Sequence, residues 1–189
     1  MVVKDLIMAI KLSLERLNKN YCMAFQEDYA QISPDVFRTY LAEKKYLELP
    51  FAYEFYHQLR NLIDSGEVDL GGPLFETNLS SIFFSTDTDA VLPDFILHLP
   101  TTTRKIGVIE FRLASNPTRI ETDLEMLAKF RRQLGYSYVI EVILGPKNVL
   151  STLKEYLTNL SNPEGDKIMI VEFNTDSWKV VAGMIGYCK

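Results

Sequence analysis

The sequence predicts an α/β fold in which a mixed central sheet is flanked by helices on both faces. Two apolar runs at 92–98 and 106–112 are separated by a polar break at 100–104, which is short enough to make them an antiparallel hairpin. A helical pattern at 116–134 then leads to an apolar run at 138–144 that is interrupted only by Glu141. This succession of strands, crossover helix and further strand is typical of α/β sheets that carry helices on both faces.

Residues 1–48 are predicted to form two helices ahead of this region. One stripe of the first helix gathers apolar residues at helical spacing, namely Leu6, Ile10, Leu14 and Leu17. The second helix opens with Ser33 as N-cap and Pro34 at its first position, where a missing N–H costs nothing. We expect an N-terminal helical addition at 1–48 and an α/β core at 49–189, together one globular domain. The addition is expected to be either an appendage or a dimerisation surface, and in the second case the protein would be a homodimer.

The core is expected to begin with a helix at 50–65, which Gly66 is placed to close. Its apolar side is formed by Phe55, Leu59, Leu62 and Ile63. The stretch 67–90 that follows is loop-like, with room for one short strand at 82–84.

After the predicted hairpin, a helix at 116–134 is ended by Gly135. Its buried stripe is expected to contain Ile120, Leu124, Leu127 and Leu134. Pro146 opens another helix, and two runs at 168–173 and 178–181 close the chain as a hairpin.

Composition bounds the class of protein. The chain has 189 residues, which suits one domain, and its apolar content of 47% is ample for a hydrophobic core. A formal net charge of −5 argues against binding nucleic acid by bulk electrostatics, although it leaves room for a local basic groove. The sequence has neither a glycine-rich phosphate loop nor a serine in a nucleophile elbow.

The cysteines and the N-terminus predict a cytoplasmic protein. Cys22 and Cys188 share no metal-ligand or redox spacing, so we expect two free thiols in a reducing compartment. No run of about 18 apolar residues predicts a membrane span. Charges are spread through residues 1–20, which is typical of an amphipathic helix and not of a signal peptide.

Two carboxylates in the predicted hairpin are the strongest candidates for a functional site. If the turn centres on Thr102, Asp94 lies opposite Glu110, with Cβ atoms about 4.5–5.5 Å apart. Carboxylates this close repel each other, and a hard divalent cation with oxygen ligands relieves the repulsion. In the alternative interpretation, Asp94 simply starts a strand after proline and Glu110 forms an ion pair with Arg112 or Lys105.

The motif around these acids resembles a known family. Pro93-Asp94 followed by the strand-borne Glu110-x-Arg112 is similar to the PD-(D/E)XK nuclease superfamily, also called restriction-endonuclease-like. The segment 53–60 resembles the first core helix of uncharacterised members of that superfamily. The segment 109–116 resembles their motif strand and its exit. The resemblance covers about residues 50–145, and it departs from the pattern where Arg112 replaces the family's lysine.

The resemblance implies a restriction-endonuclease-like fold and a metal-dependent phosphodiester hydrolase acting on DNA. Asp94 and Glu110 would hold Mg²⁺ or Mn²⁺, which polarises the scissile phosphate and lowers the pKa of an attacking water. Glu54 would assist as a third acid from the first core helix. The alternative for Glu54 is a solvent-facing charge in an intrahelical pair, for instance with Gln58.

Arg112 bears on whether such an enzyme is active. An arginine stays protonated and cannot act as the base, but its guanidinium can stabilise charge on a pentavalent phosphate. Its other interpretation is a structural ion pair with Glu110. Lys129 and Gln133, on the following helix, are candidates for a substitute base. The competing function is therefore a catalytically degenerate member that serves as a nucleic-acid or protein-interaction module. A third possibility is an unrelated protein whose carboxylates form ordinary ion pairs.

Overall fold

The computed structural model describes residues 3–22, 48–70, 74–76, 93–98, 105–148, 150–152 and 168–181. The predicted helix that begins at Ser33, the predicted strand at 82–84 and Cys188 lie outside these residues.

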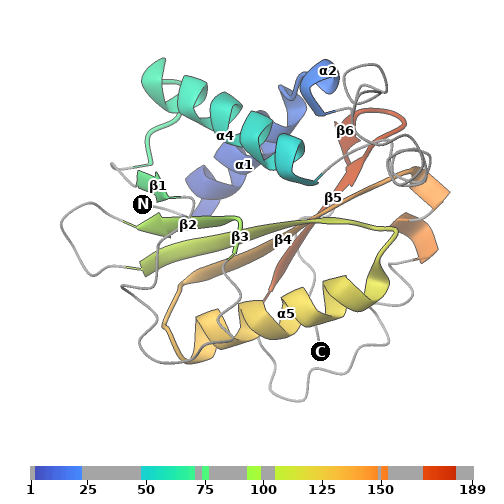
Figure 1. The fold of residues 1–189 in the computed structure, drawn as a ribbon. Coiled ribbons are helices and arrows are strands. Elements are labelled where there is room, and N and C mark those ends of the chain that lie inside the picture. The colour runs from blue at the N-terminus through green and yellow to red at the C-terminus, as the bar shows by residue number, and fades with distance from the viewer. Residues whose placement is uncertain are drawn as a thin grey trace, which may run out of the picture.

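A six-stranded mixed sheet forms the centre of the molecule, with its strands in chain order (Figure 1). The strands are β1 (Leu74–Glu76), β2 (Phe95–His98), β3 (Lys105–Leu113), β4 (Tyr138–Gly145), β5 (Met169–Asn174) and β6 (Lys179–Val180). Strand β2 is antiparallel to both of its neighbours, β1 and β3; strands β3, β4 and β5 are parallel, and β6 is antiparallel to β5. The predicted hairpin of the last two strands is thereby confirmed.

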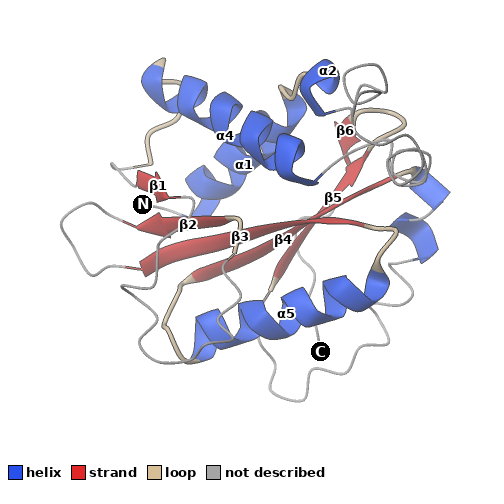
Figure 2. Cartoon of the chain, viewed as in Figure 1, coloured by secondary structure: helices blue, strands red, loops and turns tan. Residues whose placement is uncertain are grey.

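Helices cover both faces of this sheet, as Figure 2 shows. One face carries α1 (Val3–Glu15) and α4 (Glu48–Asp64), with the short α2 (Lys19–Cys22) against α4. The other face carries α5 (Pro117–Arg132), which connects β3 to the parallel strand β4. The predicted α/β class, a mixed sheet flanked by helices, is confirmed.

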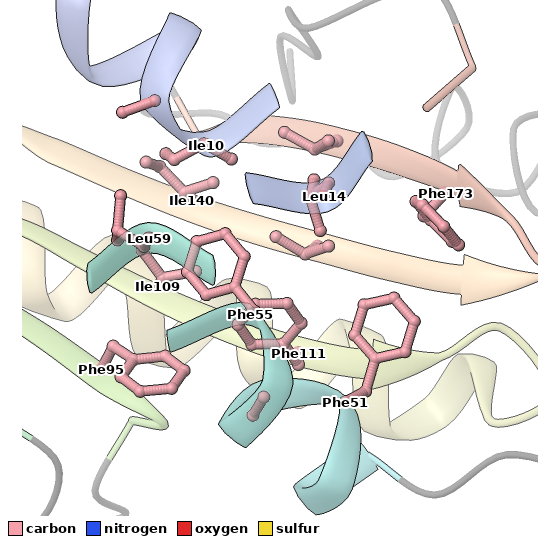
Figure 3. Packing of buried hydrophobic residues seen from close by; sticks show 14 of the residues in the cluster. Ile10, Leu14, Phe51, Phe55, Leu59, Phe95, Ile109, Phe111, Ile140 and Phe173 are labelled. Atoms are coloured by element: carbon pink, nitrogen blue, oxygen red, sulfur yellow. The ribbon is translucent and has the colours of Figure 1, made fainter. Parts of the chain in front are cut away.

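The core between the sheet and α4 is rich in aromatic rings (Figure 3). Phe55 of α4 lies 5.0 Å, between ring centroids, from Phe111 of β3. Phe51 packs edge-on against Phe173 of β5 at 5.2 Å. Successive strand residues point to opposite faces of a sheet. Because Phe111 faces α4, its neighbours Glu110 and Arg112 lie on the face that α5 covers.

The second core lies between the sheet and α5. Asn116 caps α5 by accepting a hydrogen bond from Arg119 N at 3.2 Å, and Gly135 follows the helix with a φ of 74°. Three residues of the predicted stripe are buried, namely Ile120, Leu124 and Leu127. They pack with Val108 and Ile143 from the sheet. The bounds predicted for this helix and for β4 agree with the structure within two residues.

The described part of 1–48 shares the core of the sheet. All four residues of the predicted stripe are buried, namely Leu6, Ile10, Leu14 and Leu17, and they belong to the same cluster as Phe51 and Phe55. Trp178 Nε1, in the turn between β5 and β6, donates to Leu17 O at 2.8 Å. Helix α1 is thus a layer of the fold, while the division of the chain at residue 48 stays a prediction.

One expectation is wrong within 67–90. Residues Leu74–Glu76, assigned to a loop, form β1 and pair antiparallel with β2. A three-residue strand is too short to show alternation in the sequence, and its pairing with β2 defines it. No helix in the described ranges is both long enough and apolar enough to cross a membrane.

Candidate functional site

The hairpin register brings the two predicted acids together. Phe95 pairs with Ile109, Ile96 with Val108 and Leu97 with Gly107. This register is the one that a turn centred on Thr102 produces, and it continues to Asp94 and Glu110 as the next opposed pair. A shift after Leu97 changes the register only on the far side.

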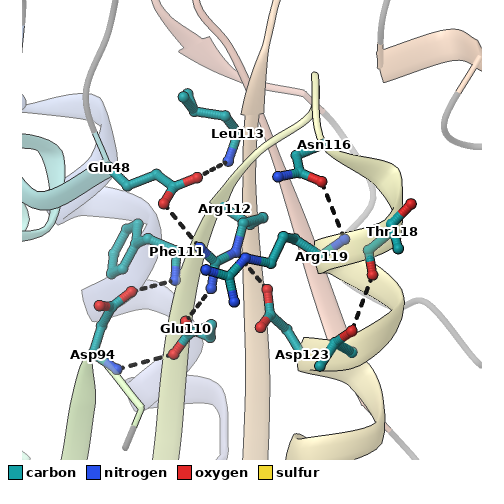
Figure 4. A network of polar contacts seen from close by, with 11 residues as sticks. Glu48, Asp94, Glu110, Phe111, Arg112, Leu113, Asn116, Thr118, Arg119 and Asp123 are labelled. Atoms are coloured by element: carbon teal, nitrogen blue, oxygen red, sulfur yellow. Dashed lines mark hydrogen bonds and ion pairs between the residues drawn. The ribbon is translucent and has the colours of Figure 1, made fainter. Parts of the chain in front are cut away.

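Backbone hydrogen bonds fix both carboxylates in the gap between β2 and β3 (Figure 4). Asp94 N donates to Glu110 Oε2 at 3.0 Å, and Phe111 N donates to Asp94 Oδ2 at 2.8 Å. The backbone of Asp94 therefore holds Glu110, and the backbone of β3 holds Asp94. One oxygen of each carboxylate is thus held by a backbone donor.

Arg112 binds three carboxylates with its three nitrogen atoms (Figure 4). Nη2 donates to Glu110 Oε1 at 2.7 Å, Nη1 to Glu48 Oε2 at 2.9 Å, and Nε to Asp123 Oδ2 at 2.5 Å. The side chain is only 13% exposed. The predicted structural ion pair with Glu110 is therefore present, as one part of a larger network.

Two members of this network were missed by the sequence analysis. Glu48 is the first residue of α4, and its second oxygen accepts from Leu113 N at 3.0 Å. Asp123 lies in the second turn of α5 and is buried. A signal existed for Asp123, which stands three residues after Ile120 within the apolar stripe, where a charge is out of place. Glu48 had no such signal because its partners come from a strand far along the chain.

Glu141 is a further acid beside this network. It is the register partner of Glu110 on β4 and is fully buried. Neither of its carboxylate oxygens has a hydrogen-bond partner in the described part of the chain. In the sequence it is the single charge within the apolar run at 138–144, a signal to which no role was given.

Burial and mutual repulsion of the carboxylates favour the binding of protons or of another cation at the cluster. Burial and the nearby charge of Asp94 raise the pKa of Glu110 to about 8. Burial raises the pKa of Asp94 to about 6, although the hydrogen bond from Phe111 opposes the shift. Burial also holds the pKa of Glu141 well above its usual range. For Arg112, burial opposes the charge, but the bond to Asp123 and the surrounding carboxylates raise its pKa further.

Glu54 is not brought to the Asp94–Glu110 pair. Its carboxylate accepts from Asn18 N at 3.1 Å and from Gln58 Nε2 at 2.7 Å, and it lies 3.3 Å from His57 Nδ1. All three partners belong to α4 or to the connection between α1 and α2. The alternative pairing with Gln58 is observed, but Glu54 is buried and does not face solvent. Glu48, six residues earlier and so turned by about 240° around the helix, reaches the cluster instead.

Lys129 and Gln133 are not brought to the cluster either. Both side chains are exposed, and Gln133 is the C-cap of α5. Asp123, which does reach Arg112, lies nearer the start of the helix. The structure therefore gives no support to a substitute base from these two residues.

Asp94 and Glu110 supply oxygen donors of the kind that a magnesium or manganese ion requires. Among the described residues, no group of three or more His, Cys, Asp or Glu side chains is arranged to hold a metal ion. Mg²⁺, however, is commonly bound by one or two carboxylates, with water and substrate phosphates supplying the rest. Asp94 and Glu110 fit this smaller set, and Asp94 Oδ1 accepts no hydrogen bond from any described residue.

Comparison with known proteins gives no relative: no family model, no curated protein and no solved structure shows a significant match to this chain.

Proposed function

We propose that this chain is a metal-dependent phosphodiester hydrolase of the PD-(D/E)XK type that acts on DNA. The observation that carries the proposal is the Asp94–Glu110 pair, opposed across two strands and held by reciprocal backbone hydrogen bonds. The order of helix α4, an antiparallel strand set, crossover helix α5 and parallel strand β4 supports a restriction-endonuclease-like fold.

Each residue then has a definable task. Asp94 and Glu110 would hold Mg²⁺ or Mn²⁺, which when bound polarises the phosphate and lowers the pKa of a water. Arg112 fixes one oxygen of Glu110 and, as an arginine, stays charged. A guanidinium has five N–H donors, and the described residues accept from three of those of Arg112. The remaining two are suited to phosphate oxygens.

A second candidate is a catalytically degenerate member that serves as a nucleic-acid or protein-interaction module. The observation that favours it is Arg112 itself, whose permanent charge rests on Glu110, Asp123 and Glu48. That charge neutralises Glu110 from within the protein and repels an approaching cation. Glu110 is also only 4% exposed, whereas an open metal site would leave its ligands accessible to substrate.

Calorimetric titration with Mn²⁺ separates the two candidates. The hydrolase predicts binding by the wild type and none by Glu110→Ala, while Glu125→Ala, an exposed acid on α5, serves as the control that binds normally. The titration is repeated with a short DNA duplex, because a metal can arrive with its substrate. Cleavage of plasmid DNA that requires Mn²⁺ and is lost in Glu110→Ala would complete the case. Absence of binding under both conditions would favour the interaction module.

A further inference from the structure

Arg119 lies on the side of α5 that reaches the carboxylate cluster. It belongs to the first turn of the helix, and Asp123, one turn later, accepts from Arg112 Nε. Residues four apart share one side of a helix, so Arg119 and Asp123 are neighbours on that side. Figure 4 shows the side chain of Arg119 extending from α5 toward Arg112. A second guanidinium is therefore directed at the first.

The guanidinium of Arg119 has no partner among the described residues. Its backbone N–H donates to Asn116 Oδ1, but its side chain forms no hydrogen bond or ion pair within the described ranges, and the residue is exposed. The stability of α5 does not account for this cation either, because the helix dipole opposes a positive charge in the first turn. All five N–H donors of the side chain are thus available to a ligand.

The unused donors of the two arginines suit one kind of ligand. Arg112 gives three of its five N–H groups to carboxylates, and two remain. Two guanidinium groups directed at each other repel, and an oxyanion between them removes the repulsion. A phosphodiester spreads its negative charge over two non-bridging oxygens, and these match the fork-shaped donors of arginine.

We infer that Arg119 binds the phosphodiester backbone of DNA, together with the remaining donors of Arg112, beside the Asp94–Glu110 pair. The inference rests on the proposed function, since it takes DNA as the ligand of this site. The two arginines differ in their settings. Arg112 is held among carboxylates inside the protein, whereas Arg119 is exposed and meets the substrate from α5. Arg119 therefore contributes to the affinity for DNA and not to the fold.

A counter-charge for the acids is the opposing model. In it, the net negative charge of the cluster attracts Arg119 through solvent, without a bond to any ligand. Replacing Arg119 would then change the free energy of unfolding, and DNA binding would change only as it does on loss of any surface cation. The two models differ in the dissociation constant for DNA relative to a variant that loses the same charge elsewhere.

The test measures binding of a short labelled DNA duplex by fluorescence anisotropy. Ca²⁺, a hard cation that takes oxygen ligands, replaces Mn²⁺, and electrophoresis verifies that the duplex stays intact. For Arg119→Ala we expect the dissociation constant to rise about tenfold or more, because charge-assisted hydrogen bonds are lost. Arg119→Lys should bind with intermediate affinity, since a lysine keeps the charge without the fork.

Arg60→Ala is the matched control. Arg60 forms an ion pair with Asp64 on α4, which covers the other face of the sheet (Figure 1). It lies 12 residues beyond Glu48, about 18 Å along the helix from the end that reaches the cluster. This variant loses the same charge away from the site, and its dissociation constant should change by less than about twofold. Equal losses in Arg60→Ala and Arg119→Ala would overturn the inference.

The salt dependence of binding supplies a readout that a purely structural role would not move. Each phosphate contact contributes about 0.9 to the slope of the logarithm of the binding constant against the logarithm of the salt concentration. Arg119→Ala should lower this slope by about one contact, and Arg60→Ala should keep the wild-type slope. A wild-type slope in Arg119→Ala would contradict a phosphate contact by Arg119.

The outcomes separate this inference from the proposed function. If plasmid cleavage in Mn²⁺ is lost in Glu110→Ala while Arg119→Ala binds and cleaves DNA as the wild type does, the proposed function stands and only the role of Arg119 is overturned. If the wild type binds no duplex, either in Ca²⁺ or in chelator, both are overturned.

Discussion

Arg112 supplies the positive charge that compensates the carboxylates of the cluster. It joins β3, α4 and α5 through Glu110, Glu48 and Asp123, all of which are at least partly buried. A buried ion network adds little stability relative to well-packed apolar residues, because desolvation offsets the attraction. Removing one partner is different, since the others are left buried without compensation.

We therefore expect Arg112→Ala to lower the free energy of unfolding by about 3–5 kcal/mol at neutral pH. Arg112→Lys should lower it less, because a lysine keeps the charge but cannot bind three carboxylates in fixed directions. Urea denaturation followed by circular dichroism measures both. A loss below about 1 kcal/mol for Arg112→Ala would mean that the network is no stronger than a surface pair.

The raised pKa values of Glu110 and Asp94 predict how stability depends on pH in the absence of metal. Their usual values are 4.5 and 3.8, and the folded values are about 8 and about 6. Between these limits the folded state binds more protons than the unfolded state, so stability falls as pH rises from about 5 to about 8. In Glu110→Gln this fall should be smaller.

Urea unfolding in chelator at several pH values checks this expectation, with Glu125→Gln as an exposed control on α5. The control should follow the wild type across the range. A wild-type free energy of unfolding that rises between pH 5 and 8 would contradict the raised pKa of Glu110.

At the scale of elements, the sequence predicted what local pattern and turn length determine. The opposition of Asp94 and Glu110 followed from a turn centred on Thr102, and the helix at α5 followed from its apolar stripe and from Gly135. The partners of Arg112 did not follow. Glu48 is 64 residues away in the sequence, and no local pattern reports which helix end reaches a given strand. Glu54 was predicted as a third acid because it lies on the first core helix, but the side of the helix on which it packs depends on α1 and α2.

The exits of β3 and β4 pack too closely to accept another methyl group. A Cβ added to Gly145 would lie 2.7 Å from Ala114 Cβ. We expect Gly145→Ala to lower the free energy of unfolding by about 1–3 kcal/mol. The double variant Ala114→Gly with Gly145→Ala should recover part of this loss, because it removes the opposing methyl group. Denaturation of both variants tests the pair, and equal losses would show that the contact is not responsible.

At the scale of the whole molecule, the N-terminal helix and the sheet share one core. Ile10 and Leu14 are buried in the cluster that holds Phe51, Phe55 and Phe111, and Trp178 joins the end of α1 to the last strands. A layer packed in this way has no separate core to fold around. The acidic cluster depends on the same packing, because α4, which carries Glu48, packs against both α1 and β3.

Unfolding should therefore be a single cooperative transition that includes α1. Trp178 is the one tryptophan of the chain, and its indole donates to Leu17, so its fluorescence reports on the docking of the N-terminal layer. We expect the fluorescence and circular-dichroism transitions in urea to coincide. Ile10→Ala should move both by the same amount, with a loss of about 2–5 kcal/mol, because Ile10 is fully buried. The opposite outcome is a fluorescence transition at a lower urea concentration than the circular-dichroism transition, with a larger separation between the two in Ile10→Ala. It would identify residues 1–48 as an addition that separates from the core before the core unfolds.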